Sequence, residues 1–136
     1  MKNRSAIASL LIPAHMTNKT AVRIAALSGF LAVALGAFGA HGLKEILLRH
    51  NTVAIWEKAV FYHFIHAAML FVLGQRRPVE GGPWLSFLAG IVLFSGSLYL
   101  LALTQARWLA VITPLGGVSF LVGWCWLMLT AGKSTS

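Results

Sequence analysis

Charged residues, and acidic residues above all, are scarce in this sequence. Only 10% of its 136 residues are charged and three are Asp or Glu, whereas soluble domains carry about 25% charged residues. This composition excludes an ordinary soluble domain. So few acids also provide no paired carboxylates, and no nucleophile stands beside a base. We therefore predict that the protein is not an enzyme.

Cysteine is nearly absent as well, since the chain has only Cys125, which lies between Trp124 and Trp126. One thiol cannot form an internal disulfide, and it does not make a metal or redox framework. We expect Cys125 to pack within a helix, and we predict no cofactor and no metal.

Apolar residues are abundant, at 58% of the sequence with a mean hydropathy of +0.79. A helix needs roughly 20 apolar residues to cross a hydrocarbon core of about 30 Å. Four segments are long enough: about 22–41, 55–74, 84–103 and 108–131. We predict an all-α integral membrane protein whose domain, residues 20–132, has four transmembrane helices in an antiparallel bundle.

Both ends of the chain are predicted to lie outside this bundle. Lys2 and Arg4 precede a short apolar run that Pro13 ends, and this run is at the lower limit for a signal peptide. The residues from Met16 onward resemble an ordinary protein start. We therefore interpret residues 1–19 as a weakly ordered extension and residues 133–136 as a polar tail.

Basic residues are distributed unevenly between the two sides of the predicted bundle. Seven belong to the amino terminus, the 75–83 turn and the tail: Lys2, Arg4, Lys19, Arg23, Arg76, Arg77 and Lys133. Four belong to the opposite loops: Lys44, Arg49, Lys58 and Arg107. This excess predicts that both termini are cytoplasmic. No basic stripe interleaved with aromatics lies outside the apolar segments, so we expect no nucleic-acid partner.

Two patterns concern packing and the first connection. Small residues recur every four positions in the first segment, which predicts a helix-packing seam: Ser28, Ala32, Gly36 and Ala40. Residues 43–54 alternate apolar and charged side chains. This alternation predicts a short interfacial helix, and an ordinary polar connection fits it nearly as well.

A pair of histidines, His63 and His66, lies one helical turn apart in the second segment, beside Tyr62. An imidazole facing lipid would lack hydrogen-bond partners, so we expect this helix face to point into the bundle. Counting residues from the ends of the apolar segments places Tyr99 and Thr113 at a similar depth. The polar groups are therefore predicted to meet in the half of the bilayer away from the cytoplasm.

The fourth segment contains a run, residues 113–117, that weakens helices. Proline lacks a backbone donor, and glycine lowers the helical preference. A break here would leave carbonyls that an imidazole N–H can satisfy. Broken helices mark substrate or ion sites in transporters, and they also occur as kinks that improve packing. The candidate polar site comprises nine residues: His41, Tyr62, His63, His66, Tyr99, Thr113, Pro114, Gly116 and Gly117.

Most of these residues fall within ordered motifs: residues 36–43 (GAFGAHGL), 62–67 (YHFIHA), 94–99 (FSGSLY) and 112–117 (ITPLGG), then Gly123-Trp124. Together the motifs resemble the family of small four-helix inner-membrane proteins of the YgdD type, a domain of unknown function related to transmembrane protein 256. The resemblance covers about residues 20–131. It implies a multi-pass protein of the bacterial inner membrane, and it implies no activity.

Three hypotheses about function stay open. In the first, which we rank highest, the histidines hold a kinked bundle together, and the protein is an accessory or assembly subunit that binds lipid and other membrane proteins or itself. In the second, an oligomer transports a small solute, ion or proton past His63, His66 and the Pro114 to Gly117 helix break. In the third, His41 joins the two histidines around a metal or haem, although the usual set of three or four ligands is incomplete.

Overall fold

The computed structural model describes residues 17–133, and every regular element in this range is helical. The elements are α2 (Asn18–Ala40), α3 (Lys44–His50), α4 (Val53–Gly74), α5 (Gly81–Gly90), the π-helix η1 (Ile91–Ser95), α6 (Gly96–Thr104) and α7 (Leu109–Thr130). The prediction of an all-α protein is confirmed. Residues 1–16 of the predicted extension and 134–136 of the tail lie outside the described residues.

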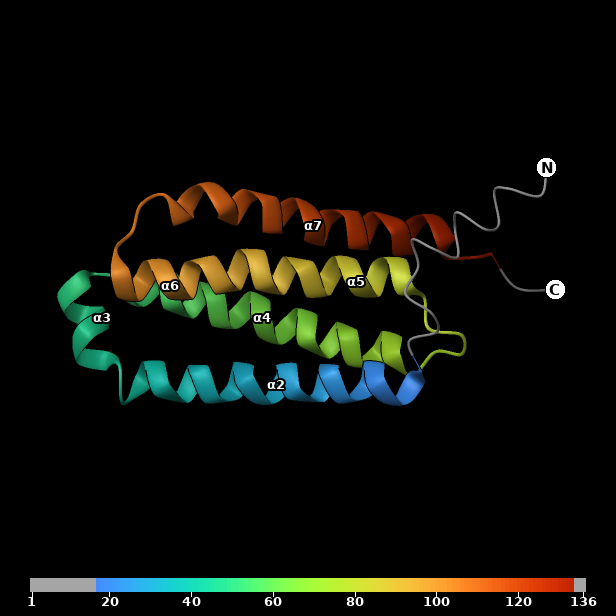
Figure 1. Cartoon of the computed structure of the whole chain (residues 1–136), viewed down its shortest axis with the longest axis horizontal. Helices are drawn as coiled ribbons and strands as arrows, with labels where there is room; N and C mark the ends of the chain where they lie inside the picture. The colour runs from blue at the N-terminus through green and yellow to red at the C-terminus, as the bar shows by residue number, and fades with distance from the viewer. Residues whose placement is uncertain (1–16, 134–136) are drawn as a thin grey trace.

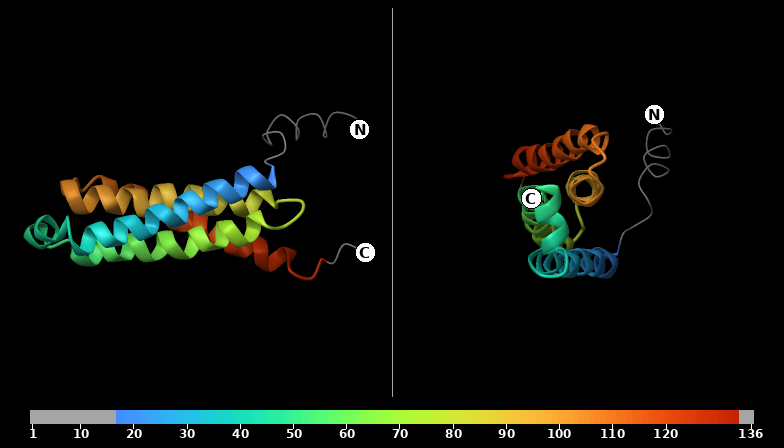
Figure 2. Two further views of the ribbon diagram at one scale, coloured as in Figure 1. Left: turned by 90° about the horizontal axis from the view of Figure 1, so that it is seen from below. Right: turned by 90° about the vertical axis from the view of Figure 1, so that its left-hand side faces the viewer.

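Helix α4 is central to the arrangement. Helices α5, η1 and α6 continue one another as a single rod, Gly81–Thr104, which packs against one side of α4 while α2 packs against another. Helix α7 packs against the rod (Figure 1). Viewed along the long axis, α2 and α7 lie on opposite sides of the molecule (Figure 2). Helix α7 therefore has one packed side, and much of its circumference is free.

Three helical stretches are long and apolar enough to cross a membrane: Asn18–Ala40, Gly81–Thr104 and Leu109–Thr130. Length and composition thus support three of the four predicted spans. Helix α4 has a comparable length of 22 residues, but it contains Glu57, Lys58 and the two histidines and is not among these three stretches.

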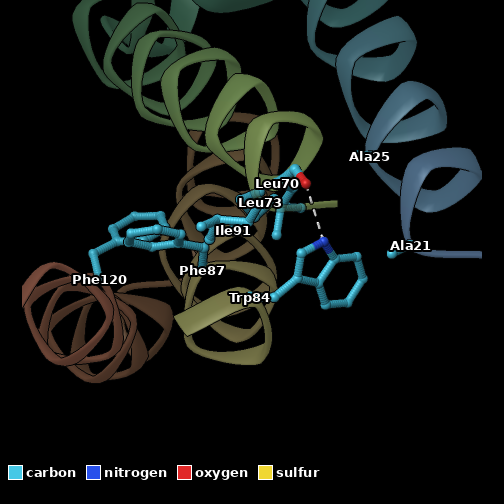
Figure 3. Packing of buried hydrophobic residues seen from close by; sticks show 8 residues of the cluster. All are labelled: Ala21, Ala25, Leu70, Leu73, Trp84, Phe87, Ile91 and Phe120. Atoms are coloured by element: carbon cyan, nitrogen blue, oxygen red, sulfur yellow. Dashed lines mark hydrogen bonds between the residues drawn. The ribbon is translucent and has the colours of Figure 1, made fainter. Parts of the chain in front are cut away.

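Buried apolar side chains form two clusters, one toward each end of α4. The first cluster, shown in Figure 3, packs Trp84 and Phe87 of α5 against Leu70 and Leu73 of α4. The indole N–H of Trp84 donates to the Leu70 carbonyl at 3.1 Å, so this large side chain is buried without an unpaired polar atom. Such contacts matter because helices in lipid associate through close packing and hydrogen bonds.

The second cluster lies toward α3 and includes Leu47, Trp56 and Tyr99. Helix α3 is present where the pattern of residues 43–54 predicts a short helix. Its last residue, His50, and Thr52 in the connection to α4 are both tied to α6, because the His50 imidazole and the Thr52 hydroxyl donate to the Ala102 carbonyl, at 3.2 and 2.8 Å. The connection between α3 and α4 is therefore held against α6.

The buried stripe of α2 differs from the predicted packing seam at both ends. Its buried residues are Ala21, Ala25, Ser28 and Ala32. The glycine that matters most for the close approach of α4 is Gly39, where a Cβ atom would clash with the indole nitrogen of Trp56. Ala40, placed in the seam from its spacing, is exposed. The helix ends there, so the four-residue repeat has no further partner to contact.

The predicted break in the fourth segment is wrong, because α7 is continuous through Pro114. A single proline removes one donor, and the hydrogen bonds on either side sustain the helix. Gly116 serves a different purpose, since a Cβ atom there would lie 2.7 Å from the Cα of Phe94 in η1. Glycine at this position lets the two backbones approach, and the irregular backbone lies in η1 instead of in α7.

Candidate functional site

His63 connects three helices at the centre of the molecule. Its Nε2 atom lies 3.1 Å from the Ser28 hydroxyl on α2, and its Nδ1 atom lies 3.1 Å from the Tyr99 hydroxyl on α6. The imidazole is only 5% exposed. Both ring nitrogens are therefore satisfied by side chains from other helices, as a buried imidazole requires.

The partners of His63 leave its proton free to occupy either nitrogen. A hydroxyl group can donate or accept a hydrogen bond. His63 can thus donate to Tyr99 while it accepts from Ser28, or do the reverse. The two tautomers need opposite orientations of the two hydroxyl groups, and exchange between them requires one proton to leave one ring nitrogen and another to reach the other.

His66 is held in one state. Its Nδ1 atom lies 2.7 Å from the Tyr62 carbonyl, which only accepts, so Nδ1 carries the proton. Its Nε2 atom accepts from the indole N–H of Trp124 on α7 at 3.1 Å. The ring also stacks on Phe120, with centroids 3.6 Å apart and planes 10° from parallel. One acceptor and one donor, each of fixed polarity, thus select the neutral Nδ1–H tautomer of His66.

The hydroxyl groups of Ser95, Ser97 and Thr113, around η1, bind backbone carbonyls and one another instead of the histidines. The fully buried Ser95 hydroxyl donates to the Ala59 carbonyl of α4 at 2.8 Å. The Ser97 and Thr113 hydroxyls lie 2.7 Å apart and connect α6 to α7. A π-helical turn places side chains out of the ordinary helical register, and here Ser95 reaches α4 while Ser97 reaches α7.

The structure brings four of the nine candidate residues together: Tyr62, His63, His66 and Tyr99. The other five lie elsewhere. His41 is exposed at the end of α2, and Pro114 is exposed on α7. Thr113 binds Ser97, whereas Gly116 and Gly117 face Phe94.

Two partners of the histidines were not among the predicted site residues. Ser28 was assigned to the packing seam only, although a hydroxyl inside an apolar helix is itself a signal for a hydrogen-bond partner. Trp124 gave no such signal, because its side chain also suits a membrane interface. Since Trp124 lies in the C-terminal third of α7, the polar groups extend past the middle of that helix, farther than depth counting predicted.

The metal hypothesis finds little geometric basis in the described part of the chain. Within residues 17–133 no three side chains of His, Cys, Asp or Glu come together in a way that would hold a metal ion. His41 lies at the end of α2, and His63 and His66 use their ring nitrogens on other partners. Every buried side-chain nitrogen and oxygen in this range has a hydrogen-bond partner.

Comparison with known proteins places the chain in a family. Residues 35–117 match the family model described as "Protein of unknown function (DUF423)". The chain is 46% identical to a UPF0382 membrane protein of Staphylococcus epidermidis, over 85% of this chain and 97% of that protein. It is 45% identical to the UPF0382 membrane protein YwdK of Bacillus subtilis, over 85% and 98%.

A third relative, the UPF0382 inner membrane protein YgdD of Escherichia coli K12, is 44% identical over 85% of this chain and 92% of its own length. No solved structure matches the chain. The predicted resemblance is thus confirmed, and the chain belongs to the DUF423 family of YgdD-type membrane proteins, whose function is unknown.

Proposed function

We propose that all four long helices cross the bacterial inner membrane. Helix α4 is about 33 Å long at 1.5 Å per residue, enough for a hydrocarbon core of about 30 Å. It packs between α2 and the rod, both of which contain candidate spans. Its histidines are buried, and Glu57 and Lys58 lie near its start. A helix of this length that packs between two candidate spans crosses the bilayer with them.

Both termini of this four-span protein face the cytoplasm in our proposal. The start of α2, the 75–80 loop and the end of α7 share one end of the molecule (Figure 1). Among the described residues that end carries five basic side chains: Lys19, Arg23, Arg76, Arg77 and Lys133. The opposite end carries four, and the positive-inside rule therefore favours this orientation.

We propose further that the protein is an accessory or assembly subunit, without enzymatic activity, that binds a transmembrane helix of another membrane protein. The observation that carries this proposal is the exposure of α7. Only four of its 22 residues are buried: Leu109, Gly116, Phe120 and Gly123. Its large exposed side chains extend from Trp108 to Leu129. An exposed face of this length is long enough to span both leaflets. A transmembrane helix of a partner protein can therefore pack along it.

The C-terminal half of this face is hollowed. A groove of about 520 Å³ follows α7 from Val118 to Lys133, with Leu121, Cys125 and Trp126 along it. Membrane helices associate by fitting side chains into such hollows. Tryptophan is also the residue most enriched among those that dominate binding energy at interfaces. Cys125, which is exposed, therefore lies inside the proposed contact.

Cys125 allows a direct test because the chain has no other cysteine. A maleimide probe with a photoactivatable group is attached to Cys125 in native membranes and irradiated. We expect a cross-linked peptide from a transmembrane helix of one membrane protein, identified by mass spectrometry. In the matched control, Cys125→Ser is combined with Ala26→Cys, an exposed position on α2, and this adduct should be absent.

Two results would overturn the proposed partner. The same set of adducts from both positions would mean that the probe reports random encounters in the bilayer. An adduct only between two copies of this chain would make the occupant of the α7 face a second copy instead of another protein.

A second candidate function, proton movement, is supported by one observation. The His63 imidazole lies between two hydroxyls, so it can accept a proton on one side and release it on the other. Proteoliposomes with a pH gradient test this. Wild type should dissipate the gradient faster than His63→Gln, and equal rates at the background level would exclude the relay. Tyr99→Phe, which removes one hydroxyl and keeps the imidazole, should be as slow as His63→Gln.

A further inference from the structure

A second apolar groove, of about 560 Å³, lies between α2 and α4, and α3 contributes one end. Its floor consists of Gly36, Gly39 and Ala40 of α2, which place no large side chain in it. One wall consists of Phe61 and Phe64 of α4, and these rings are 60% and 52% exposed. Sites for small molecules usually have volumes of about 300–1,000 Å³, so this groove has room for a ligand.

The length of the groove indicates what kind of ligand it takes. It follows α4 from Val53 to Ile65, a rise of about 18 Å. One leaflet of the hydrocarbon core is about 15 Å thick. The groove thus covers a single leaflet, unlike the free face of α7, which covers two. A single acyl chain, with its headgroup at the α3 end, matches this extent.

The α3 end of the groove carries two opposite charges. Lys44 of α3 and Glu57 of α4 both line it, and both side chains are exposed. Neither forms an ion pair within residues 17–133, where the salt bridge present joins Arg76 to Glu80. An available cation and an available anion at the headgroup level complement a ligand that itself carries a phosphate and an ammonium.

We propose that this groove binds one phospholipid with a zwitterionic headgroup of the phosphatidylethanolamine type. One acyl chain lies along Phe61 and Phe64, the phosphate faces Lys44, and the ammonium faces Glu57. An anionic lipid without an amine meets Glu57 with a like charge and is disfavoured. This site uses α2, α3 and α4, so it is independent of the proposed partner on α7.

Native mass spectrometry of the full chain in mild detergent tests the site. The added lipids are phosphatidylethanolamine and phosphatidylglycerol with identical acyl chains. Wild type should retain one phosphatidylethanolamine in preference to phosphatidylglycerol. Ala40→Phe, which fills the groove, should weaken retention by roughly tenfold, the effect of about 1.4 kcal/mol. The matched control is Ala26→Phe, the same change at an exposed position of α2 outside the groove.

Glu57→Gln keeps the groove open and removes only the anion, so it serves even if Ala40→Phe does not fold. It should retain lipid while losing the preference for phosphatidylethanolamine. Equal retention by Ala40→Phe and Ala26→Phe would overturn the groove as the site. Equal retention of the two lipids by wild type, or an unchanged preference in Glu57→Gln, would overturn the assignment of the headgroup.

Discussion

The adjacent glycines of α7 offer a test of the packing in which neighbouring substitutions should act in opposite directions. A Cβ atom at Gly116 would lie 2.7 Å from the Cα of Phe94, whereas one at Gly117 would meet only the edge of the Phe94 ring, at 3.8 Å. Ordinary contact begins at about 3.4 Å. Alanine at position 116 therefore forces α7 and η1 apart by at least about 0.7 Å, and no side chain can move aside to relieve the clash.

The magnitudes follow from two opposing effects. Replacing glycine by alanine within a helix stabilises it by up to about 1 kcal/mol. Overpacking costs about 1–3 kcal/mol, and the clash at position 116 is with backbone, so the upper part of that range applies. Gly116→Ala should therefore lower the free energy of unfolding by roughly 1–2 kcal/mol. Gly117→Ala should leave it unchanged or raise it by up to about 1 kcal/mol.

Equilibrium unfolding in mixed micelles, followed by circular dichroism, measures both variants against wild type. The two positions share a helix, a depth and a chemical change, so each controls for the other. If both substitutions shifted the unfolding free energy by the same amount and in the same direction, the close approach of α7 to η1 would be refuted.

Two further substitutions test contacts of the site and the seam. Trp124→Phe keeps an aromatic ring but removes the donor to His66, so unfolding should become easier by about 0.6–1.7 kcal/mol, the range of hydrogen bonds between membrane helices; no change would mean that this bond contributes nothing. Gly39→Ala should cost about 1–3 kcal/mol, because Trp56 must leave its place against α2, where its indole N–H donates to the Leu35 carbonyl at 2.9 Å. Unfolding of Gly39→Ala at the wild-type free energy would contradict the close contact of α2 with α4.

The helical class and the approximate extents of the long helical segments could be predicted because apolar runs and the turns between them are local properties of the sequence. The position of the irregular backbone could not be predicted. Residues 112–117 contain the residues that weaken helices, yet α7 is continuous there, because its neighbour η1 packs against Gly116 and supports it. The π-helical turn at residues 91–95 has no such residues in its interior. It coincides with the contact of Ser95 with Ala59, a tertiary interaction that no local pattern reveals.

The candidate site could likewise be predicted only in part. The burial of His63 and the proximity of Tyr99 follow from the cost of an imidazole in lipid and from counting depths. Which helix supplies the partner of His66 depends on the position of α7 around the rod, and helical periodicity does not determine that position. The pairing of His66 with Trp124 therefore emerges only from the assembled fold.

The proposed four-span topology and the one-leaflet groove both require α4 to cross the membrane. Single cysteines in a Cys125→Ser background report which side each end of α4 occupies. Glu45→Cys on α3 and Gln75→Cys after α4 are both exposed positions. With a membrane-impermeant maleimide in intact cells, Glu45→Cys should be labelled, and Gln75→Cys should be labelled only after lysis. Labelling of both positions from the same side would contradict a spanning α4.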